Sequence, residues 1–288
     1  MSQILNSHQG AAVFAYLVRL AAWLVILVAI FGPLEHLFAV RRNRFFYPGW
    51  SKNLIWYGVN SLTPILLLGP PSALLALGAH AMLPSALTDA VSAMPLWARM
   101  AAAMVVGEVG FYWGHRWSHE IPLLWRFHAI HHSAEHLSFL VNNRAHPLDM
   151  VFTRLCGLVL LYATGLASPV GANPGLVPAV VLFVSSIWSF FIHANVCWRL
   201  GPLEWVASSP AFHHWHHTRD DHKDHNYASM MPVMDLLFGT FYLPAHWPTA
   251  YGTSTITPDT VVGQIADPLL GIRESQIAAT SLDLSNLR

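Results

Sequence analysis

Long apolar stretches dominate the sequence and limit the folds that the chain can adopt. A helix that crosses the hydrocarbon core of a bilayer needs about 20 mostly apolar residues. Charged residues make up only 10% of the chain, against about 25% in soluble domains. The sequence therefore predicts an all-α integral membrane protein with about four to five membrane-spanning or re-entrant helices. The five candidate stretches are residues 11–31, about 54–77, 96–113, 150–167 and 176–197.

The distribution of basic residues predicts how these helices are oriented. The linkers 78–95 and 168–174 contain neither Lys nor Arg, whereas the linker after the first stretch contains Arg41, Arg42, Arg44 and Lys52. Basic residues favour the cytoplasmic side, so we expect that linker inside the cell and the N-terminus outside. With five crossings, every histidine-rich segment lies on the cytoplasmic face. Replacing two consecutive crossings by a re-entrant hairpin leaves this result unchanged, whereas losing a single crossing does not.

Other compositional features exclude several classes of protein. The formal net charge of zero gives no indication of nucleic-acid binding, which usually leaves a basic surface. Cys156 and Cys197 lie in apolar stretches and are expected to be small buried residues rather than disulfide or cluster partners. The first nine residues lack Lys and Arg, unlike a cleaved signal peptide. We expect one membrane-embedded domain at 1–252, with its histidine-bearing core at about 96–251, and a polar tail at 253–288.

Fourteen of the eighteen histidines lie between residues 115 and 225, and most of these form three clusters with helical spacing. The clusters are His115 and His119, then His128, His131 and His132, and finally His213, His216 and His217. Residues three or four positions apart lie on one face of a helix. Pro122 separates the first two clusters and suits the first turn of a new helix. We therefore expect a helix end, a turn and a second helix that faces back.

The three clusters offer eight imidazoles, more than one metal ion of ordinary coordination can use. Zinc sites take three or four protein ligands, so the number favours two six-coordinate ions with positions open for water or oxygen. Imidazole alone does not select among Zn, Cu, Fe and Ni. His193, at the end of the fifth stretch, is expected to be a further ligand. His146 could be a ligand or a hydrogen-bond donor to one, and His225 could be such a donor.

Several neighbouring residues leave alternatives open. His214 is expected to point to a different helical face from the third cluster. Nearby acids could orient the imidazole N–H groups or serve as caps and ion-pair partners; these are Glu108, Glu135, Asp149 and Asp235. His119-Glu120 begins like a zinc-protease motif, but Leu123 occupies the place of its second histidine. The alternative from another class is a membrane metal-binding or transport protein, which predicts ligands in mid-span.

In combination, these motifs resemble the sterol desaturase and fatty acid hydroxylase superfamily of membrane di-iron enzymes. The superfamily pattern H-x-x-x-H, H-x-x-H-H and a later H-x-x-H-H corresponds to residues 115–119, 128–132 and 213–217. Further similar elements are LWRFHAIHHS, RAHPLD, FIHANV, HNYA and MDLLFGTFY. The resemblance covers about residues 114–251 and the spans before them. Ala228 replaces the usual Gly, Met234 replaces the usual Trp, and His214 and His225 are additional.

The resemblance implies an all-α membrane domain whose cytoplasmic helical cap carries two iron ions. The implied reaction is an O2-dependent hydroxylation of an unactivated C–H bond in a sterol, fatty acyl chain or related lipid. Lipid desaturation by the same metal site is the alternative. The eight clustered histidines and His193 are the implied ligands, with His146 less certain, and no separate acid or base is implied. Contacts to these ligands are expected from His225, Asn226 and Asp149.

The resemblance also implies a separate source of electrons. The sequence contains no cytochrome domain, flavin motif or cysteine cluster. A cytochrome b5-like protein, or a ferredoxin-like protein with its reductase, is therefore the expected partner and would dock on the cytoplasmic face. The apolar spans are expected to hold the lipid chain against the metal site, so that position rather than acid–base chemistry determines which carbon reacts.

Overall fold

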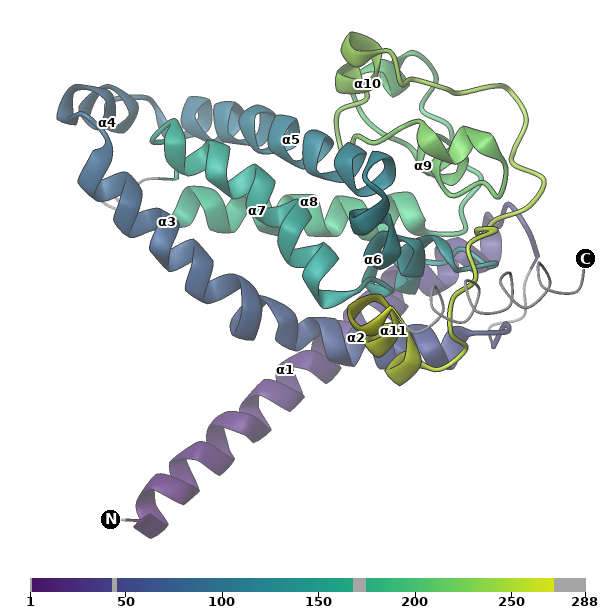
Figure 1. Ribbon diagram of the computed structural model, residues 1–288, viewed down its shortest axis with the longest axis horizontal. Coiled ribbons are helices and arrows are strands. Elements are labelled where there is room, and N and C mark those ends of the chain that lie inside the picture. Colours follow the sequence, from purple (N-terminus) through teal and green to yellow (C-terminus); the bar gives the residue numbers. More distant parts are fainter. Residues whose placement is uncertain (1, 43–45, 168–174, 272–288) are drawn as a thin grey trace, which may run out of the picture.

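The computed structural model describes residues 2–42, 46–167 and 175–271, with side chains from Gly10 onward. Its α-helices are α1 (Ser2–Leu37), α2 (Trp50–Thr63), α3 (Gly69–Met82), α4 (Ser85–Ser92), α5 (Leu96–Glu120), α6 (Pro122–His132), α7 (Pro147–Ala163), α8 (Leu176–His193), α9 (Pro210–His216), α10 (Val233–Phe238) and α11 (Val261–Leu270). Short 3₁₀ or π segments are η1 (Pro64–Leu68), η2 (Phe139–Asn143), η3 (Gly201–Trp205) and η4 (Asp221–Asp224). The described residues contain no strand, so the predicted all-α membrane fold is confirmed (Figure 1).

Three helical segments are long and apolar enough to cross a membrane by themselves, and a bent pair would make a fourth. α1 contributes Gly10–Leu37, α8 contributes Leu176–His193, and α2, η1 and α3 form one segment over Trp50–Met82. The bent pair consists of α4 and α5, which meet at 117°. α7, with 17 residues, is slightly shorter than a usual span. All five predicted stretches are therefore helical, but only three of them qualify as single spans.

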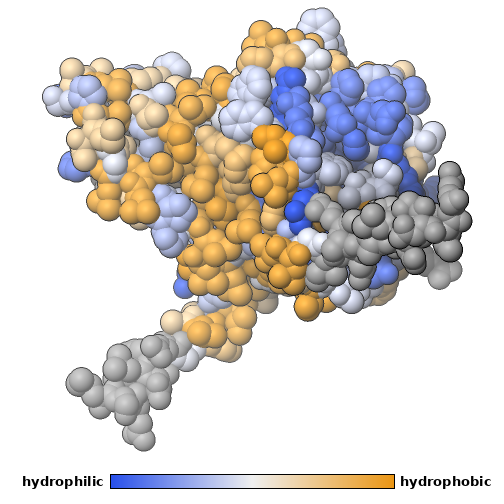
Figure 2. All heavy atoms as spheres, viewed as in Figure 1, coloured by the Kyte–Doolittle hydropathy of each residue, from blue (hydrophilic) through white to orange (hydrophobic). Residues whose placement is uncertain are grey.

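The surface divides into an apolar part and a polar part (Figure 2). Apolar atoms cover the helical body around α3, α5 and α7, while polar atoms gather on the side that holds α9. α1 projects from this body, and its side chains Phe14 and Val25 are 69% and 66% exposed. Large apolar side chains exposed over a whole helix require a lipid or protein environment. The polar end is therefore the part that faces water.

Close contact between antiparallel helices α5 and α7 fixes the interior of the bundle. A Cβ added at Gly110 would lie 2.7 Å from the Gly157 Cα atom, and one at Gly114 would lie 3.0 Å from the Cys156 Sγ atom. Small residues of this kind let helix backbones approach closely in membranes. The contact brings the start of α7 beside the histidine-bearing end of α5. Cys156 is half-buried, so its predicted burial holds only in part, and the prediction for Cys197 is wrong, because this residue follows α8 on an exposed loop.

Buried and half-buried polar side chains connect the first two spans to the loops at the polar end. Glu35, near the end of α1, accepts backbone N–H groups from Phe139 at 2.7 Å and Asn195 at 3.0 Å. Asn60 on α2 donates to the Ala145 carbonyl at 2.7 Å. Such groups satisfy backbone atoms that would otherwise be buried without partners. They hold the segments before and after the histidine clusters in fixed positions.

The described part of the predicted polar tail, residues 253–271, packs against the body through α11. α11 contacts α2 and α6, and Gln264 accepts a hydrogen bond from the buried Trp56 Nε1 atom at 2.9 Å. Val262 and Leu270 of α11 remain 77% and 68% exposed. An apolar face on a short helix beside the spans suits the membrane interface. Residues 272–288 lie outside the described part of the chain, and the single domain at 1–252 stays a prediction.

Candidate metal centre

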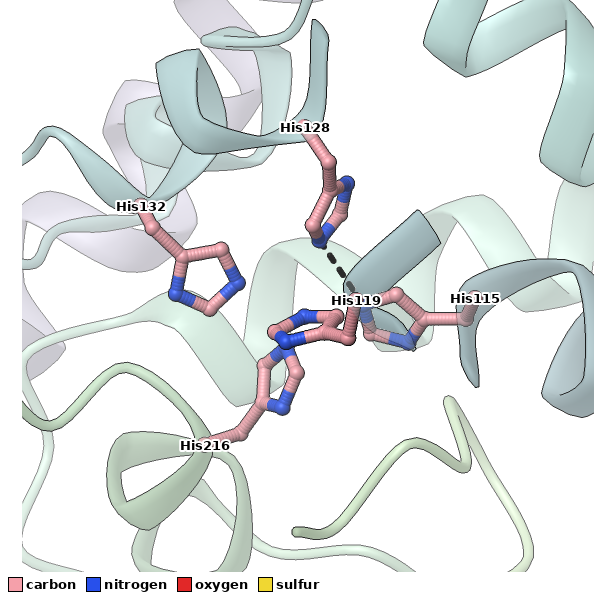
Figure 3. A group of neighbouring side chains, drawn as sticks. All are labelled: His115, His119, His128, His132 and His216. Carbon is pink, nitrogen blue, oxygen red and sulfur yellow. Dashed lines mark hydrogen bonds between the residues drawn. The ribbon is translucent and has the colours of Figure 1, made fainter. Parts of the chain in front are cut away.

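Five histidines from three helices converge at the end of α5 and form the first histidine group (Figure 3). They are His115 and His119 of α5, His128 and His132 of α6, and His216 of α9. One ring nitrogen of each lies within 4.8 Å of those of the others. Pro122 occupies the first turn of α6, so the chain reverses there and α6 faces α5, as the sequence predicts. Helical spacing then directs the side chains of both helices toward one point.

Four more histidines form the second histidine group beside the first. They are His131 of α6, His193 at the end of α8, His213 of α9 and His217 directly after it. All four are buried. The Nε2 atom of His213 lies 2.9 Å from that of His193 and 3.1 Å from that of His217. In each H-x-x-H-H motif, the middle histidine thus belongs to one group and the two outer histidines belong to the other.

Hydrogen bonds on the far side of the rings show which nitrogens carry protons in the second group. The Nδ1 atom of His131 donates to the Arg144 carbonyl at 3.0 Å, and that of His193 donates to the Ser189 carbonyl at 2.7 Å. In a neutral imidazole, the other nitrogen is then an unprotonated acceptor. The two Nε2 atoms nevertheless lie 3.1 Å apart. Two lone pairs at this distance repel each other unless a cation lies beside them.

The first group has the same arrangement. The Nδ1 atom of His115 donates to the Tyr227 carbonyl at 2.7 Å, and that of His128 donates to Asp149 Oδ2 at 3.0 Å. Their Nε2 atoms, joined by the dashed line in Figure 3, face each other at 3.1 Å. Metal-bound histidines characteristically donate the other N–H group to a carboxylate or carbonyl. The hydrogen bonds in both groups therefore prepare the rings for metal ligation.

Other ring nitrogens in the two groups are buried without a hydrogen-bond partner among the described residues. They are Nε2 of His119 and His216, Nδ1 of His213 and His217, and both nitrogens of His132. Buried polar atoms rarely lack a partner, so their number indicates that a ligand completes the site. Nine neutral nitrogens in adjacent groups of five and four fit a pair of late transition-metal ions.

Asp149 is the carboxylate that fixes His128, and replacing it by asparagine is expected to weaken metal binding by about tenfold to a hundredfold. The asparagine side chain is neutral, so it would hold the His128 N–H group less strongly than the carboxylate does. Chelator competition on the purified protein measures the affinity. The exposed Asp89 on α4 offers a matched control, because Asp89→Asn leaves the histidines untouched. Equal affinities for Asp149→Asn and Asp89→Asn would contradict the role of Asp149.

Burial makes the metal-free site sensitive to acid. Desolvation, together with repulsion from neighbouring imidazoles, lowers the pKa well below its usual value of 6.5 for His131, His132, His213, His216 and His217. The same histidines take up protons near pH 6.5 in the unfolded chain. Acid therefore stabilises the unfolded state more than the folded state.

The free energy of unfolding of the metal-free protein is accordingly expected to fall as the pH drops below 6.5. Each of these histidines contributes up to about 1.4 kcal/mol per pH unit. Thermal denaturation of the chelator-treated protein between pH 7.5 and pH 5.5 measures the change. A midpoint that does not fall over this interval would show that these imidazoles are not held neutral in the folded chain.

Two histidines of the region lie outside both groups. His146, considered as a ligand from the sequence, caps α7 through Nδ1 and donates through Nε2 to the Ile265 carbonyl at 3.2 Å. His214 lies 2.8 Å from the Tyr251 hydroxyl and donates to the Ala194 carbonyl at 3.0 Å. Both ring nitrogens of each residue are thus engaged by the protein. The structure places His146 in a capping role, and His214 points away from its neighbours, as expected.

Three residues were expected from the sequence to contact the histidines of the site, and they do so in different ways or not at all. Asp149 contacts His128 through its carboxylate, as described above. His225 contacts His216 through its backbone carbonyl, which accepts the His216 Nδ1–H group at 2.8 Å, and not through its ring. Asn226 reaches no histidine ring; its side chain donates to the Phe212 carbonyl at 2.9 Å. It therefore acts indirectly, by fixing the backbone around α9.

The other acids near the site serve the backbone or the surface. Glu108 accepts the Met230 N–H group at 2.7 Å. Asp235 accepts the N–H groups of Tyr227 at 2.8 Å and of the next residue at 2.9 Å. The exposed Glu135 lies 3.8 Å from Arg219. Of the four acids considered from the sequence, only Asp149 contacts a histidine of the two groups directly.

Sequence reasoning missed several contacts to the histidines. Asp224 accepts a hydrogen bond from His119 Nδ1 at 3.0 Å. The carbonyls of Tyr227, Arg144 and Ser189 hold three further rings. Backbone carbonyls occur at every residue and carry no sequence signal. Asp224 directly precedes His225 in the sequence, but nothing in the sequence indicates that it contacts a residue 105 positions earlier. That contact depends on the tertiary fold.

Both histidine groups lie in a part of the chain that matches a known protein family. Residues 100–240 match the family model of the fatty acid hydroxylase family. Ornithine lipid hydroxylase OlsE of Rhizobium tropici is 35% identical over 151 residues, which are 52% of this chain and 44% of that protein. Human alkylglycerol monooxygenase is 34% identical over 135 residues, 46% of this chain and 28% of that protein.

A plant relative extends the comparison to sterol-acting enzymes. Methylsterol monooxygenase 2-2 of Arabidopsis thaliana is 28% identical over 154 residues, covering 51% of this chain and 55% of that protein. The chain thus spans about half or less of the length of these curated relatives. No solved structure matches it. The segment that matches the fatty acid hydroxylase family contains all nine histidines of the two groups. The curated relatives that this segment resembles are members of the sterol desaturase and fatty acid hydroxylase superfamily.

Proposed function

We propose that the chain is a membrane di-iron enzyme that uses O2 to hydroxylate an unactivated C–H bond of a lipid. The observation that carries this proposal is the pair of histidine groups, whose unprotonated Nε2 atoms face each other. Two iron ions held by the five and the four histidines would supply reductive activation of O2 and oxidation of the C–H bond. The relatives named above act, by their names, on ornithine lipids, alkylglycerols and methylsterols, which supports a lipid substrate.

A pocket beside the two groups is the proposed position of the reacting carbon. Histidines of both groups line it, namely His115, His128, His131, His193 and His213. Apolar walls from Phe111, Met150 and Ile192 complete part of it. A lipid chain that enters between α5, α7 and α8 would displace water from these walls and present one carbon to the histidine groups. The chain's contribution to the reaction is this positioning, together with the hydrogen bonds that hold the imidazoles.

The site is proposed to lie on the cytoplasmic face. The backbone N–H group of Arg41 donates to Asn195 Oδ1 at 3.2 Å, and its guanidinium donates to the Pro248 carbonyl at 2.6 Å. Asn195 follows His193 by two residues, so the basic linker and the second histidine group occupy the same end of the molecule. Basic linkers favour the cytoplasm. A separate cytochrome b5-like or ferredoxin-like electron donor would therefore reach the site from that side.

Comparison of lipids from cells with and without the chain tests the proposed reaction. Mass spectrometry is expected to find a lipid that gains one oxygen atom only in cells that contain the chain. A lipid that instead loses two hydrogens would indicate the desaturase alternative. Purified protein that binds metal but changes no lipid, in the presence of O2 and an electron donor, would contradict an enzyme and favour the metal-binding or transport alternative.

A further inference from the structure

Arg154 is a half-buried charged residue for which the described part of the chain supplies no counterion. It lies on α7, one turn after Met150, and lines the pocket beside the histidine groups. No residue that the structure describes forms a hydrogen bond or an ion pair with it. A guanidinium stays charged and presents five N–H donors in a plane. A half-buried guanidinium loses part of its hydration, and no described residue replaces the lost hydrogen bonds. Its position in the pocket therefore suits an anionic ligand that enters from outside the chain.

Arg154 lines two neighbouring pockets, and one acid lines each of them, Glu108 the first and Asp149 the second. Both acids already accept hydrogen bonds from other groups. Glu108 accepts backbone N–H groups from Met230 at 2.7 Å and Met231 at 3.1 Å. Asp149 accepts the Nδ1–H group of His128 at 3.0 Å, and its other oxygen accepts a hydrogen bond from a serine hydroxyl at 3.3 Å. Neither carboxylate pairs with Arg154. The positive charge therefore remains available to an anion that enters the pocket.

The surroundings of Arg154 are polar on one side and apolar on the other. Arg154 borders two pockets, of about 100 and 110 Å³, which share much of their lining and continue one another between α5, α7 and α8. Hydroxyl and amide groups around them come from Asn142, Thr153, Ser185, Ser186, Ser189 and Ser229. Apolar walls come from Leu158, Leu161 and Val181. Such a lining suits an amphiphile, with a charged group at Arg154 and a chain along the apolar walls.

The position of Arg154 relative to the histidines limits where the anionic group sits. Arg154 follows Asp149, the partner of His128, by five residues, or about 7–8 Å along a helix. Helical side chains lean toward the N-terminus of their helix, which here is the end with Asp149. The same pocket is bordered by Arg154 and by histidines of both groups. A group bound by Arg154 is thus a short distance from the carbon presented to the histidines.

We propose that Arg154 binds an anionic group of the lipid, a carboxylate or a phosphate, and so selects substrates that are oxidised close to that group. That the bound lipid is a substrate rests on the proposed function. The anion site itself rests only on Arg154 and its pocket. It distinguishes an amphiphile with an acidic head from neutral sterols and neutral alcohols. Oxidation near the head, rather than at the far end of the chain, follows from the short separation.

Binding of single-chain amphiphiles to the metal-loaded protein tests the proposal without turnover. Laurate, dodecyl phosphate and dodecanol share a chain length and differ in the head group, while inorganic phosphate has a head group and no chain. Calorimetric titration in a neutral detergent is expected to show that wild-type protein binds laurate or dodecyl phosphate at least about tenfold more tightly than dodecanol. Arg154→Gln is expected to abolish this preference without weakening dodecanol binding, and Arg154→Lys to keep part of it.

Arg99 offers a matched control, because its guanidinium binds the Leu166 carbonyl at 3.1 Å and does not line the two pockets. Arg99→Gln is expected to keep the preference for the anion. Equal affinity of wild-type protein for all three amphiphiles, or an unchanged preference in Arg154→Gln, would overturn the proposal. Inorganic phosphate that binds as tightly as dodecyl phosphate would overturn the assignment to a lipid head group. Anion binding that depends on Arg154, without any lipid oxidation, would contradict the proposed function and leave the anion site standing.

Discussion

Replacing His132 by alanine is expected to lower the metal content from about two ions per chain to about one and to reduce lipid oxidation more than a hundredfold. The side chain is fully buried in the first histidine group, and neither ring nitrogen has a hydrogen-bond partner among the described residues. The substitution therefore removes a proposed ligand without breaking a hydrogen bond. Loss of a residue that only supports a ligand already costs about tenfold to a hundredfold. Metal analysis and product quantification on the same sample measure both effects.

His222 provides the control for this experiment. It is partly exposed on η4, and its ring lies 3.0 Å from Asp220 Oδ1, away from both groups. His222→Ala is expected to retain both metal ions and full oxidation. A His132→Ala protein that keeps two ions and full activity would refute the ligand assignment. Equal losses in both variants would show that the effect is not specific to the first histidine group.

Replacing Gly110 by alanine is expected to destabilise the protein by about 2–3 kcal/mol and to lower its melting temperature in detergent by roughly 5–10 °C. The added Cβ would lie 2.7 Å from the Gly157 Cα atom, and backbone cannot rotate aside as a side chain can. α5 and α7 must therefore separate. Because α7 also carries Asp149, which holds His128 of α6, a shift of α7 is expected to lower metal affinity together with stability.

Gly107 lies one turn earlier on α5 and offers a matched comparison. A Cβ there would meet only side-chain atoms of Val181 and Leu161, at 3.6 and 3.7 Å, which is ordinary van der Waals contact. The melting temperature of Gly107→Ala is expected to stay within about 2 °C of the wild-type value. If the two alanine variants melt at the same temperature, close backbone contact at Gly110 does not determine the packing of α5 on α7.

The helices and the gathering of histidines could be predicted because both depend on local spacing. Apolar runs of sufficient length predicted every stretch that became α1, the segment of α2 and α3, α5, α7 and α8. The i, i+3 and i+4 intervals in H-x-x-x-H and H-x-x-H-H predicted shared helical faces. His193 was also expected at the site, because α8 ends there. All nine histidines assigned from the sequence lie in the two groups, and their role as ligands stays a proposal.

The division of these histidines between the two groups depends on tertiary contacts, and the spacing does not contain it. His131 and His132 are adjacent in the sequence but belong to different groups, because consecutive residues of a helix point in different directions and here meet different partner helices. The exclusion of His146 depends on the carbonyl of Ile265, which lies 119 residues away on α11. α11 itself was missed, because its apolar residues lie in a segment that is polar on average. Long-range backbone contacts of this kind leave no periodic signal in a single sequence.

The most direct test of the central claim is the fate of molecular oxygen in a reaction with ¹⁸O2. Iron-loaded protein in lipid vesicles, supplied with an electron donor, is expected to yield a lipid product that carries one ¹⁸O atom. The His132→Ala protein is expected to yield almost none. Consumption of ¹⁸O2 with loss of two hydrogens and no label in the lipid would identify desaturation. Full metal occupancy with neither labelled product nor consumption of ¹⁸O2 would contradict the claim that the two histidine groups form an oxygen-dependent lipid hydroxylase.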